Sequence, residues 1–226
     1  MFAKKLNKVH FAVNGLVAAL GLLASISTQA AIYGGVDFPG GVASFADAVV
    51  SYEPTWGGAS GPQVSDRSDP LQSLGVPTGS WYSGFVTLGD GGRVTLRFAD
   101  NSLTGSGSSA FDLWIFEVGE DVEDTYVDIS KDGANWFSVG KVAGSTAGID
   151  IDTYGFGTSD FFSYVRLTDD TNEGEQGNSQ TAGADIDAVG AISSAPPVNH
   201  VPEPTTLALL GVALAMAGMR GRPASR

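Results

Sequence analysis

The central part of the chain alternates between short apolar runs and polar turn segments. In the run at 93–100, Val94, Leu96 and Phe98 fall on one face and polar residues fall between them, which is the period of two typical of a half-buried strand. The runs carry no helical period. They therefore predict an all-β fold, an antiparallel β-sandwich of jelly-roll type. These runs cover residues 84–89, 93–100, 111–118, 124–130, 136–143, 164–170 and 184–193.

The segments between the runs carry turn signals. GDGG at 89–92 and KDGANW at 131–136 predict hairpins between neighbouring runs. Residues 31–77 are cut by several prolines and are expected to be rich in loops, with only FADAVVSYEP at 45–54 predicting a short strand or helical turn. Ile-Asp pairs recur at 149–152 and 185–188, but they are too short to establish an internal repeat.

Residues 1–30 have the order of a secretory signal peptide. Three lysines precede an apolar stretch that predicts a signal helix, and small residues follow it up to Ala30. We expect signal peptidase to cut between Ala30 and Ala31, so that a sandwich domain of residues 31–194 is exported. The alternative is a retained N-terminal anchor.

The C-terminal segment, residues 201–226, follows a linker at 195–200 and has three parts. About 13 apolar residues at 207–219 would span roughly 20 Å as a helix, less than the ~30 Å of a hydrocarbon core, which predicts a short transmembrane helix. The basic residues behind it would stay on the cytoplasmic side. An ordinary tail anchor is the alternative. The flanking parts are a motif of Val201, Pro202, Glu203 and Pro204, and a basic stop of Arg220 and Arg222.

These three parts, in this order, resemble the PEP-CTERM protein-sorting signal of Gram-negative bacteria. The resemblance implies transient insertion in the inner membrane, cleavage by an exosortase, and final placement at the cell surface or in the extracellular matrix. The resemblance implies a route of export and sorting but no activity for the body of the protein. It also implies association with extracellular polysaccharide or biofilm.

The charge of the body excludes several kinds of partner and site. Residues 31–199 hold 24 acidic and six basic residues, so nucleic acid is not an expected partner, whereas cations and neutral polymers are compatible with this charge. The chain has no cysteine, and residues 31–199 have no histidine, which excludes Ser-His-Asp and Cys-His catalysis and the usual zinc ligands there. A metal in this region would need oxygen ligands alone.

Carboxylates follow several of the runs and offer such ligands. Asp185 and Asp187 are two apart on a predicted strand, so both should point to one face, where other strand ends could complete a calcium site. A solvated acidic face is the alternative interpretation. DISKDGANWFSV at 128–139 resembles a calcium loop, but its twelfth position is Val139 rather than glutamate, which favours a hairpin turn around Asp132 and Gly133.

The stretch at 111–140, followed by YVRLTDD and ADIDAVGAI, is similar to discoidin-like or galactose-binding-like jelly-roll domains. Such domains often hold a structural calcium ion, and the resemblance implies that Glu117 and Asp187 are among its ligands. Many of these domains also bind sugars, and Trp56, Trp81 and Tyr82 lie in predicted loops where their rings could stack on sugar rings. Capping the open end of the sandwich is the other role open to these aromatic residues.

We therefore expect an exported, non-enzymatic surface or matrix protein associated with exopolysaccharide or biofilm. The first alternative is a calcium-dependent carbohydrate-binding module. The second is a secreted glycoside hydrolase, which would need two carboxylates about 5–10 Å apart. None of the carboxylate pairs lies in a recognisable acid/base motif, so we do not expect an enzyme.

Overall fold

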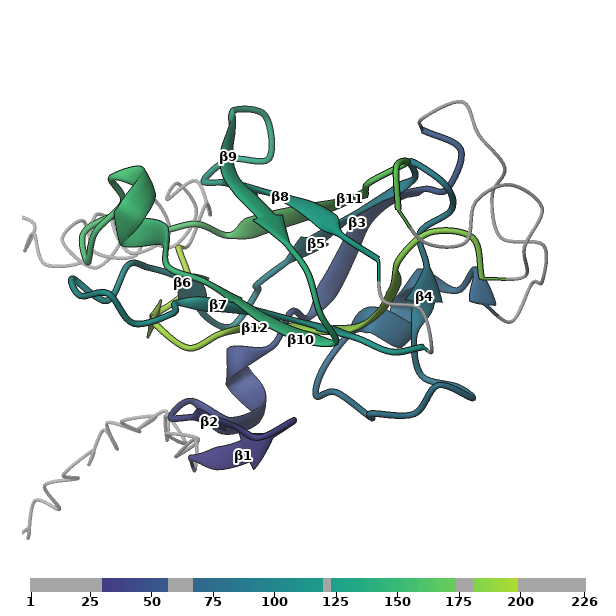
Figure 1. Ribbon diagram of the computed structural model, residues 1–226. Coiled ribbons are helices and arrows are strands. Elements are labelled where there is room, and N and C mark those ends of the chain that lie inside the picture. Colours follow the sequence, from purple (N-terminus) through teal and green to yellow (C-terminus); the bar gives the residue numbers. More distant parts are fainter. Residues whose placement is uncertain (1–29, 57–66, 120–122, 174–180, 199–226) are drawn as a thin grey trace, which may run out of the picture.

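The computed structural model describes residues 30–56, 67–119, 123–173 and 181–198. Two antiparallel sheets face each other: a five-stranded sheet of order β3-β5-β11-β8-β9 and a four-stranded sheet of order β10-β7-β12-β4 (Figure 1). The strands are β1 Ala31–Tyr33, β2 Val36–Phe38, β3 Ala48–Glu53, β4 Val86–Thr87, β5 Arg93–Arg97, β6 Ser102–Leu103, β7 Leu113–Glu117, β8 Thr125–Ser130, β9 Trp136–Val142, β10 Thr146–Ile149, β11 Tyr164–Asp169, β12 Asp185–Ala191 and β13 Ser194–Ala195, and the 3₁₀-helices are η1 Gly41–Ser44, η3 Pro70–Ser73 and η4 Ile151–Tyr154.

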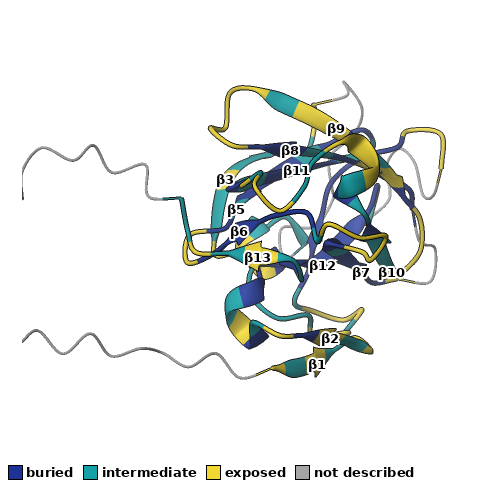
Figure 2. Ribbon diagram, turned by 90° about the vertical axis from the view of Figure 1, so that its left-hand side faces the viewer, coloured by how far each residue is buried: buried dark blue, intermediate teal, exposed yellow. Residues whose placement is uncertain are grey.

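Every run predicted as a strand contains one, and the all-β antiparallel prediction is confirmed. The alternation read from the sequence also holds in β5, since Val94 and Leu96 are fully buried between the sheets. The jelly-roll type stays a prediction. The buried residues concentrate between the two sheets, whereas β9 and the β1–β2 hairpin are largely exposed (Figure 2).

A second, smaller apolar cluster forms where the β1–β2 hairpin and η1 pack on the four-stranded sheet. Phe38 and Phe45 lie 4.6 Å apart between ring centroids, and both contact Phe116 of β7. A Cβ atom on Gly190 of β12 would lie 2.7 Å from Phe38 and 2.9 Å from Phe45. The hairpin can dock this closely because β12 carries no side chain at that position.

The prediction of a hairpin at GDGG, residues 89–92, is wrong. Strand β4 before this turn pairs with β12, whereas β5 after it pairs with β3 and β11, so the turn carries the chain from one sheet to the other. Asp169 at the end of β11 accepts hydrogen bonds from the backbone N–H groups of Gly91 and Ala184, both at 2.8 Å. This buried carboxylate ties the turn to the five-stranded sheet, which is a contact that no local turn signal reveals.

The second predicted hairpin, KDGANW at 131–136, is confirmed by the pairing of β8 with β9. Gly133 takes a φ of 75°, a left-handed conformation that favours glycine. The Asp132 carboxylate accepts hydrogen bonds from the N–H groups of Ala134 and Asn135, and these donors hold the pKa of Asp132 well below its usual value. The aspartate therefore stabilises the turn itself, in agreement with the hairpin interpretation.

The edges of the domain differ in part from the sequence expectation. FADAVVSYEP contains a strand, β3, but the β1–β2 hairpin was not predicted in this proline-rich region. The first residues of the predicted linker at 195–200 belong to the body, because β13 pairs with β6 and Ser102 hydrogen-bonds to Pro196 and Val198.

The predicted signal helix and the predicted C-terminal transmembrane helix lie outside the described residues. Among the described residues, no helix has the length and apolar character to span a membrane.

Candidate functional site

A groove of about 600 Å³ opens beside the four-stranded sheet. Its floor includes Phe116 and Glu117 from the end of β7, and the turn between β1 and β2 contributes Gly34. One wall is the loop that carries Trp81, and Thr146 at the start of β10 also lines the groove. The remaining lining residues are Pro77, Thr78, Gly79, Val118, Gly119, Ser145, Thr146 and Asp187.

The loop that forms the wall is held by Asp187. One carboxylate oxygen, Oδ1, accepts hydrogen bonds from the backbone nitrogen of Thr78 at 3.0 Å and from its Oγ1 at 3.1 Å. The other, Oδ2, accepts from the backbone nitrogen of Gly79 at 2.8 Å. Because the Asp187 side chain is almost fully buried, the loop is anchored by a carboxylate that has little contact with water.

A β-bulge places Asp187 in this position. Ile186 of β12 pairs with Glu117 of β7, and Ala188 pairs with the neighbouring Phe116, so Asp187 is the extra residue. Ile186 packs in the core between the sheets, and Ala188 packs in the cluster under the β1–β2 hairpin. The bulge thus leaves Asp187 outside the regular pairing with β7, and its side chain hydrogen-bonds to Thr78 and Gly79 of the loop.

Of the three predicted stacking residues, Trp81 lines the groove, and Tyr82 contacts the Trp81 ring without lining the groove itself. Trp81 and Tyr82 are 46% and 73% exposed, and their ring centroids lie 4.4 Å apart. Trp56 is also exposed, but it does not line the groove, and the Arg93 guanidinium lies 3.2 Å from its ring centroid. One face of the Trp56 ring is therefore already occupied by a cation.

The predicted metal ligands do not gather into one site. Glu117 accepts a hydrogen bond from the backbone nitrogen of Glu123 at 3.0 Å, Asp187 holds the loop, and Asp185 accepts from the Thr87 hydroxyl. Among the described residues, the groups of three carboxylates that could hold a metal do not include Glu117, Asp185 or Asp187. The structure instead gives each of these acids a separate hydrogen-bonding role.

Of the two acids that line the groove, Glu117 has a pKa shifted far from its usual value. Burial raises the pKa of Glu117, and the neighbouring Glu123 side chain raises it further, so the carboxyl favours its neutral form. The other acid in the groove, Asp187, already accepts three hydrogen bonds from the loop. Asp187 is therefore committed to the loop, whereas Glu117 presents a mainly neutral carboxyl among the residues that line the groove.

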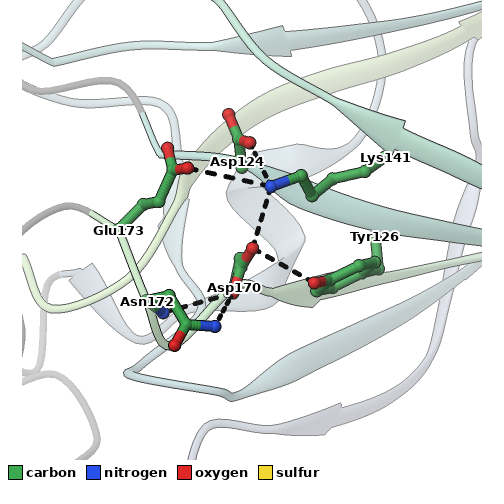
Figure 3. A network of polar contacts seen from close by, with 6 residues as sticks. All are labelled: Asp124, Tyr126, Lys141, Asp170, Asn172 and Glu173. Carbon is green, nitrogen blue, oxygen red and sulfur yellow. Dashed lines mark hydrogen bonds and ion pairs between the residues drawn. The ribbon is translucent and has the colours of Figure 1, made fainter.

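Sequence reasoning missed a network of polar residues where β8 begins and β11 ends (Figure 3). The Lys141 ammonium pairs with Asp124, lies 2.9 Å from Asp170 and lies 3.8 Å from Glu173. Tyr126 donates a hydrogen bond to Asp170 at 3.1 Å. These residues come from separate strands and a loop, so only the pairing of β8 with β9 and β11 brings them together.

A comparison with models of protein families identifies a known motif in the C-terminal segment. The model of the PEP-CTERM protein-sorting motif matches residues 200–222, which include Val201 to Pro204 and both predicted stop arginines. The chain carries a PEP-CTERM sorting signal. This PEP-CTERM signal indicates export and recognition by an exosortase.

The search of curated proteins gave no match. Among solved structures, the chain is similar to the C-terminal domain of a chitobiase from Bacteroides fragilis, with 14% sequence identity and a TM-score of 0.35. The likeness covers 62% of this chain and 92% of that domain. At so low a TM-score this likeness carries no argument about the function of the chain.

Proposed function

We propose that the protein is a non-enzymatic component of the cell surface or extracellular matrix, and that its β-sandwich binds a neutral polysaccharide in the groove beside Trp81. The observation that carries this proposal is the exposed pair of Trp81 and Tyr82 on a loop that Asp187 anchors at the edge of the groove. The PEP-CTERM signal supports it by indicating an exported protein.

The chemistry of the groove suits a sugar chain. Aromatic faces stack on the apolar faces of sugar rings, and Trp81 offers such a face in a groove that the apolar Phe116 also lines. Ser145 and Thr146 line the same groove, and their hydroxyl groups can exchange hydrogen bonds with sugar hydroxyls. A mixed lining of this kind is typical of sites that bind polar, uncharged ligands.

The charge of the protein favours a neutral polymer over an anionic one. Residues 31–199 hold 24 acidic and six basic residues, so a polyanion would be repelled over much of the surface. Among the described residues, the charged side chains that line the groove are those of Glu117 and Asp187, and none of the lining residues is basic. Polymers of uncharged sugars are therefore the class of ligand that we expect.

Delivery places the sandwich where such polymers accumulate. Signal peptidase would release the N-terminal segment between Ala30 and Ala31, and the PEP-CTERM signal would hold the protein in the inner membrane until exosortase cuts it. The sandwich would then reach the cell surface or matrix of a Gram-negative bacterium and contact exopolysaccharide or a biofilm.

The test is binding of the protein, purified from its host, to a glycan array and to insoluble neutral polysaccharides. We expect Trp81→Ala to weaken binding about tenfold or more, because one stacking face is lost. Trp56→Ala is the matched control, since this exposed tryptophan does not line the groove. The proposal fails if no glycan is retained, or if Trp81→Ala and the unmodified protein bind equally well.

The same assay separates the alternatives. A calcium-dependent carbohydrate-binding module would lose its signal when a chelator is added, whereas the stacking groove as described should keep it. A glycoside hydrolase would release reducing ends from the retained polymer over time. Release that Glu117→Gln abolishes would show that the groove is catalytic and would overturn the non-enzymatic proposal.

A further inference from the structure

Three aspartates meet at the end of the sandwich where β7 begins. Asp112 directly precedes β7, Asp150 is the N-cap of η4, and Asp152 lies in the first turn of η4. Each offers a carboxylate oxygen, and these oxygens lie within 4.8 Å of one another. The pairing of β10 with β7 causes this proximity, because Ile149 pairs with Leu113 and its carbonyl accepts from the backbone nitrogen of Asp112 at 2.8 Å.

Asp112 is the buried member of this group. Its side chain has no exposed surface, and Oδ2 accepts a hydrogen bond from the backbone nitrogen of Ile151 at 2.9 Å. The second oxygen, Oδ1, is buried and has no hydrogen-bond partner among the described residues. An ionised carboxylate oxygen in this position is unfavourable unless a proton or a cation reaches it.

The other two carboxylates are held in place by backbone groups. Asp150 Oδ1 accepts from the backbone nitrogen of Asp152 at 3.0 Å, and Asp152 Oδ2 accepts from that of Gly107 at 3.0 Å. A Cβ atom on Gly105 would lie 2.8 Å from Asp152 Oδ2 and would also collide with the carbonyl oxygen of Phe156. The segment at 105–107 can therefore wrap closely around Asp152 only with glycine at position 105.

The acidic network of Figure 3 shows what balances a comparable cluster elsewhere in this protein. There, the Lys141 ammonium lies among Asp124, Asp170 and Glu173 and neutralises part of their charge. No salt bridge between described residues reaches Asp112, Asp150 or Asp152. The cluster at η4 has a similar density of carboxylates without a basic side chain paired to it.

We propose that Asp112, Asp150 and Asp152 bind a hard divalent cation, and that calcium is the ion that fits. Carboxylates are the ligands that calcium prefers, and three carboxylate oxygens within 4.8 Å of one another can converge on one ion at about 2.3–2.6 Å after a small shift of their side chains. Asp150 and Asp152 are partly exposed, so water can complete the six to eight oxygens that calcium takes. Magnesium is a poorer match because it demands near-ideal octahedral geometry.

This site differs from the calcium site predicted from the sequence and from the glycan groove. None of the three aspartates lines the groove, and none belongs to the predicted set of Glu117, Asp185 and Asp187. The bound ion would join the start of β7 to η4 and to the segment at 105–107. Its role is to stabilise that end of the sandwich, independently of glycan binding.

The test is a thermal melt of the mature protein after treatment with a chelator, with calcium or magnesium chloride added back. Calcium should raise Tm by about 5 to 10 °C at a concentration roughly 100-fold above Kd. Titration calorimetry should give one ion per chain. Lack of any calcium response up to about 10 mM would overturn the site, since extracellular calcium modules bind at about 0.1 to 1 mM. An equal response to magnesium would overturn the assignment to calcium.

Asp150→Asn is the sharpest variant, because asparagine keeps the N-cap of η4 while it removes a charged ligand. We expect it to weaken calcium binding at least tenfold. Asp69→Asn is the matched control: Asp69 caps η3 in the same way but belongs to no carboxylate group among the described residues. An unchanged calcium response in both Asp150→Asn and Asp152→Asn would overturn the proposal.

Discussion

The Asp187 carboxylate holds Thr78 through two hydrogen bonds, one from the backbone nitrogen at 3.0 Å and one from Oγ1 at 3.1 Å. The two residues are 109 positions apart in the chain. Through this contact a bulge in β12 sets the position of the loop that carries Trp81, so the last long strand of the body determines one wall of the groove.

Asp187→Ala should loosen this loop without unfolding the sandwich. Three hydrogen bonds to one carboxylate are lost, and we expect the free energy of unfolding to fall by about 1 to 3 kcal/mol. Urea denaturation measures this change, and proteolysis should cut the loop faster. Asp37→Ala is the control, because Asp37 is exposed and its loss should change stability by less than about 0.5 kcal/mol. Equal effects of the two substitutions would contradict the anchoring role.

Glu117 should make the protein less stable as pH rises. Its folded-state pKa is raised above the usual 4.5, so the folded state binds this proton more tightly than the unfolded state does. The stabilisation is complete at low pH and is lost as pH rises from about 4.5 toward the raised pKa, with each unit of difference worth about 1.4 kcal/mol. Asp169, whose pKa burial raises to about 6, adds a loss between about pH 4 and 6.

Glu117→Gln isolates the contribution of this residue. The amide can still accept from the backbone of Glu123 but carries no charge, so thermal melts between pH 6 and 8 should show a flatter profile and a higher Tm at pH 8 than the unmodified protein. Glu53→Gln, at a partly exposed acid, should leave the slope in this range unchanged. If Glu117→Gln and the unmodified protein have the same slope, Glu117 ionises normally.

Lys141→Met should lower Tm, because Asp124 and Asp170 lose the ammonium that balances their charge. The ammonium and the Asn172 side chain lower the pKa of Asp170 to about 2, so the stabilisation by this pair is present above about pH 4 and is lost as pH falls. The double variant Lys141→Met with Asp170→Asn should recover part of the lost Tm. Strictly additive losses in this double-mutant cycle would show that the two side chains do not interact.

Removal of residues 201–226 should change the location of the protein without changing the stability of its body. Both apolar clusters are built from described residues between Tyr33 and Ile192, so the truncated body should show the same thermal transition. Cell fractionation should find the truncated protein in a different compartment, because the PEP-CTERM signal is gone. A body that melts at a lower temperature after truncation would show that the segment is part of the fold.

Features with a local signal could be predicted from the sequence. The alternation in β5 reflects a strand with one face toward a core, and the Asp132-Gly133 turn carries its own hydrogen bonds and its own left-handed glycine. The GDGG turn shows where this reasoning fails. Glycine and aspartate mark a reversal of the chain, but whether the next strand joins the same sheet depends on a distant contact, here Asp169 with Gly91.

Trp81, Glu117 and Asp187 were singled out from the sequence and line one groove, but the acidic clusters were predictable only in their residue types. An acidic chain without cysteine, and without histidine between residues 31 and 199, limits that region to oxygen ligands and disfavours polyanionic partners. Which carboxylates meet was not predictable, because Asp112 and Asp150 become neighbours only through the pairing of β7 with β10. The same holds for Lys141 among its three acids, which come together through the pairing of β8 with β9 and β11.

The sequence by itself determined the strand pattern, the charge of the body and the sorting signal. The strand pattern and the sorting signal depend on residues that are neighbours in the chain, and the charge depends on composition alone, so none of the three needs a long-range contact. Only the tertiary structure decided which sheet each strand joins, where the groove opens and which acids share a site. These features rest on contacts between residues far apart in the chain, and the energy of such contacts depends on burial and hydrogen bonding that exist only after the two sheets have packed.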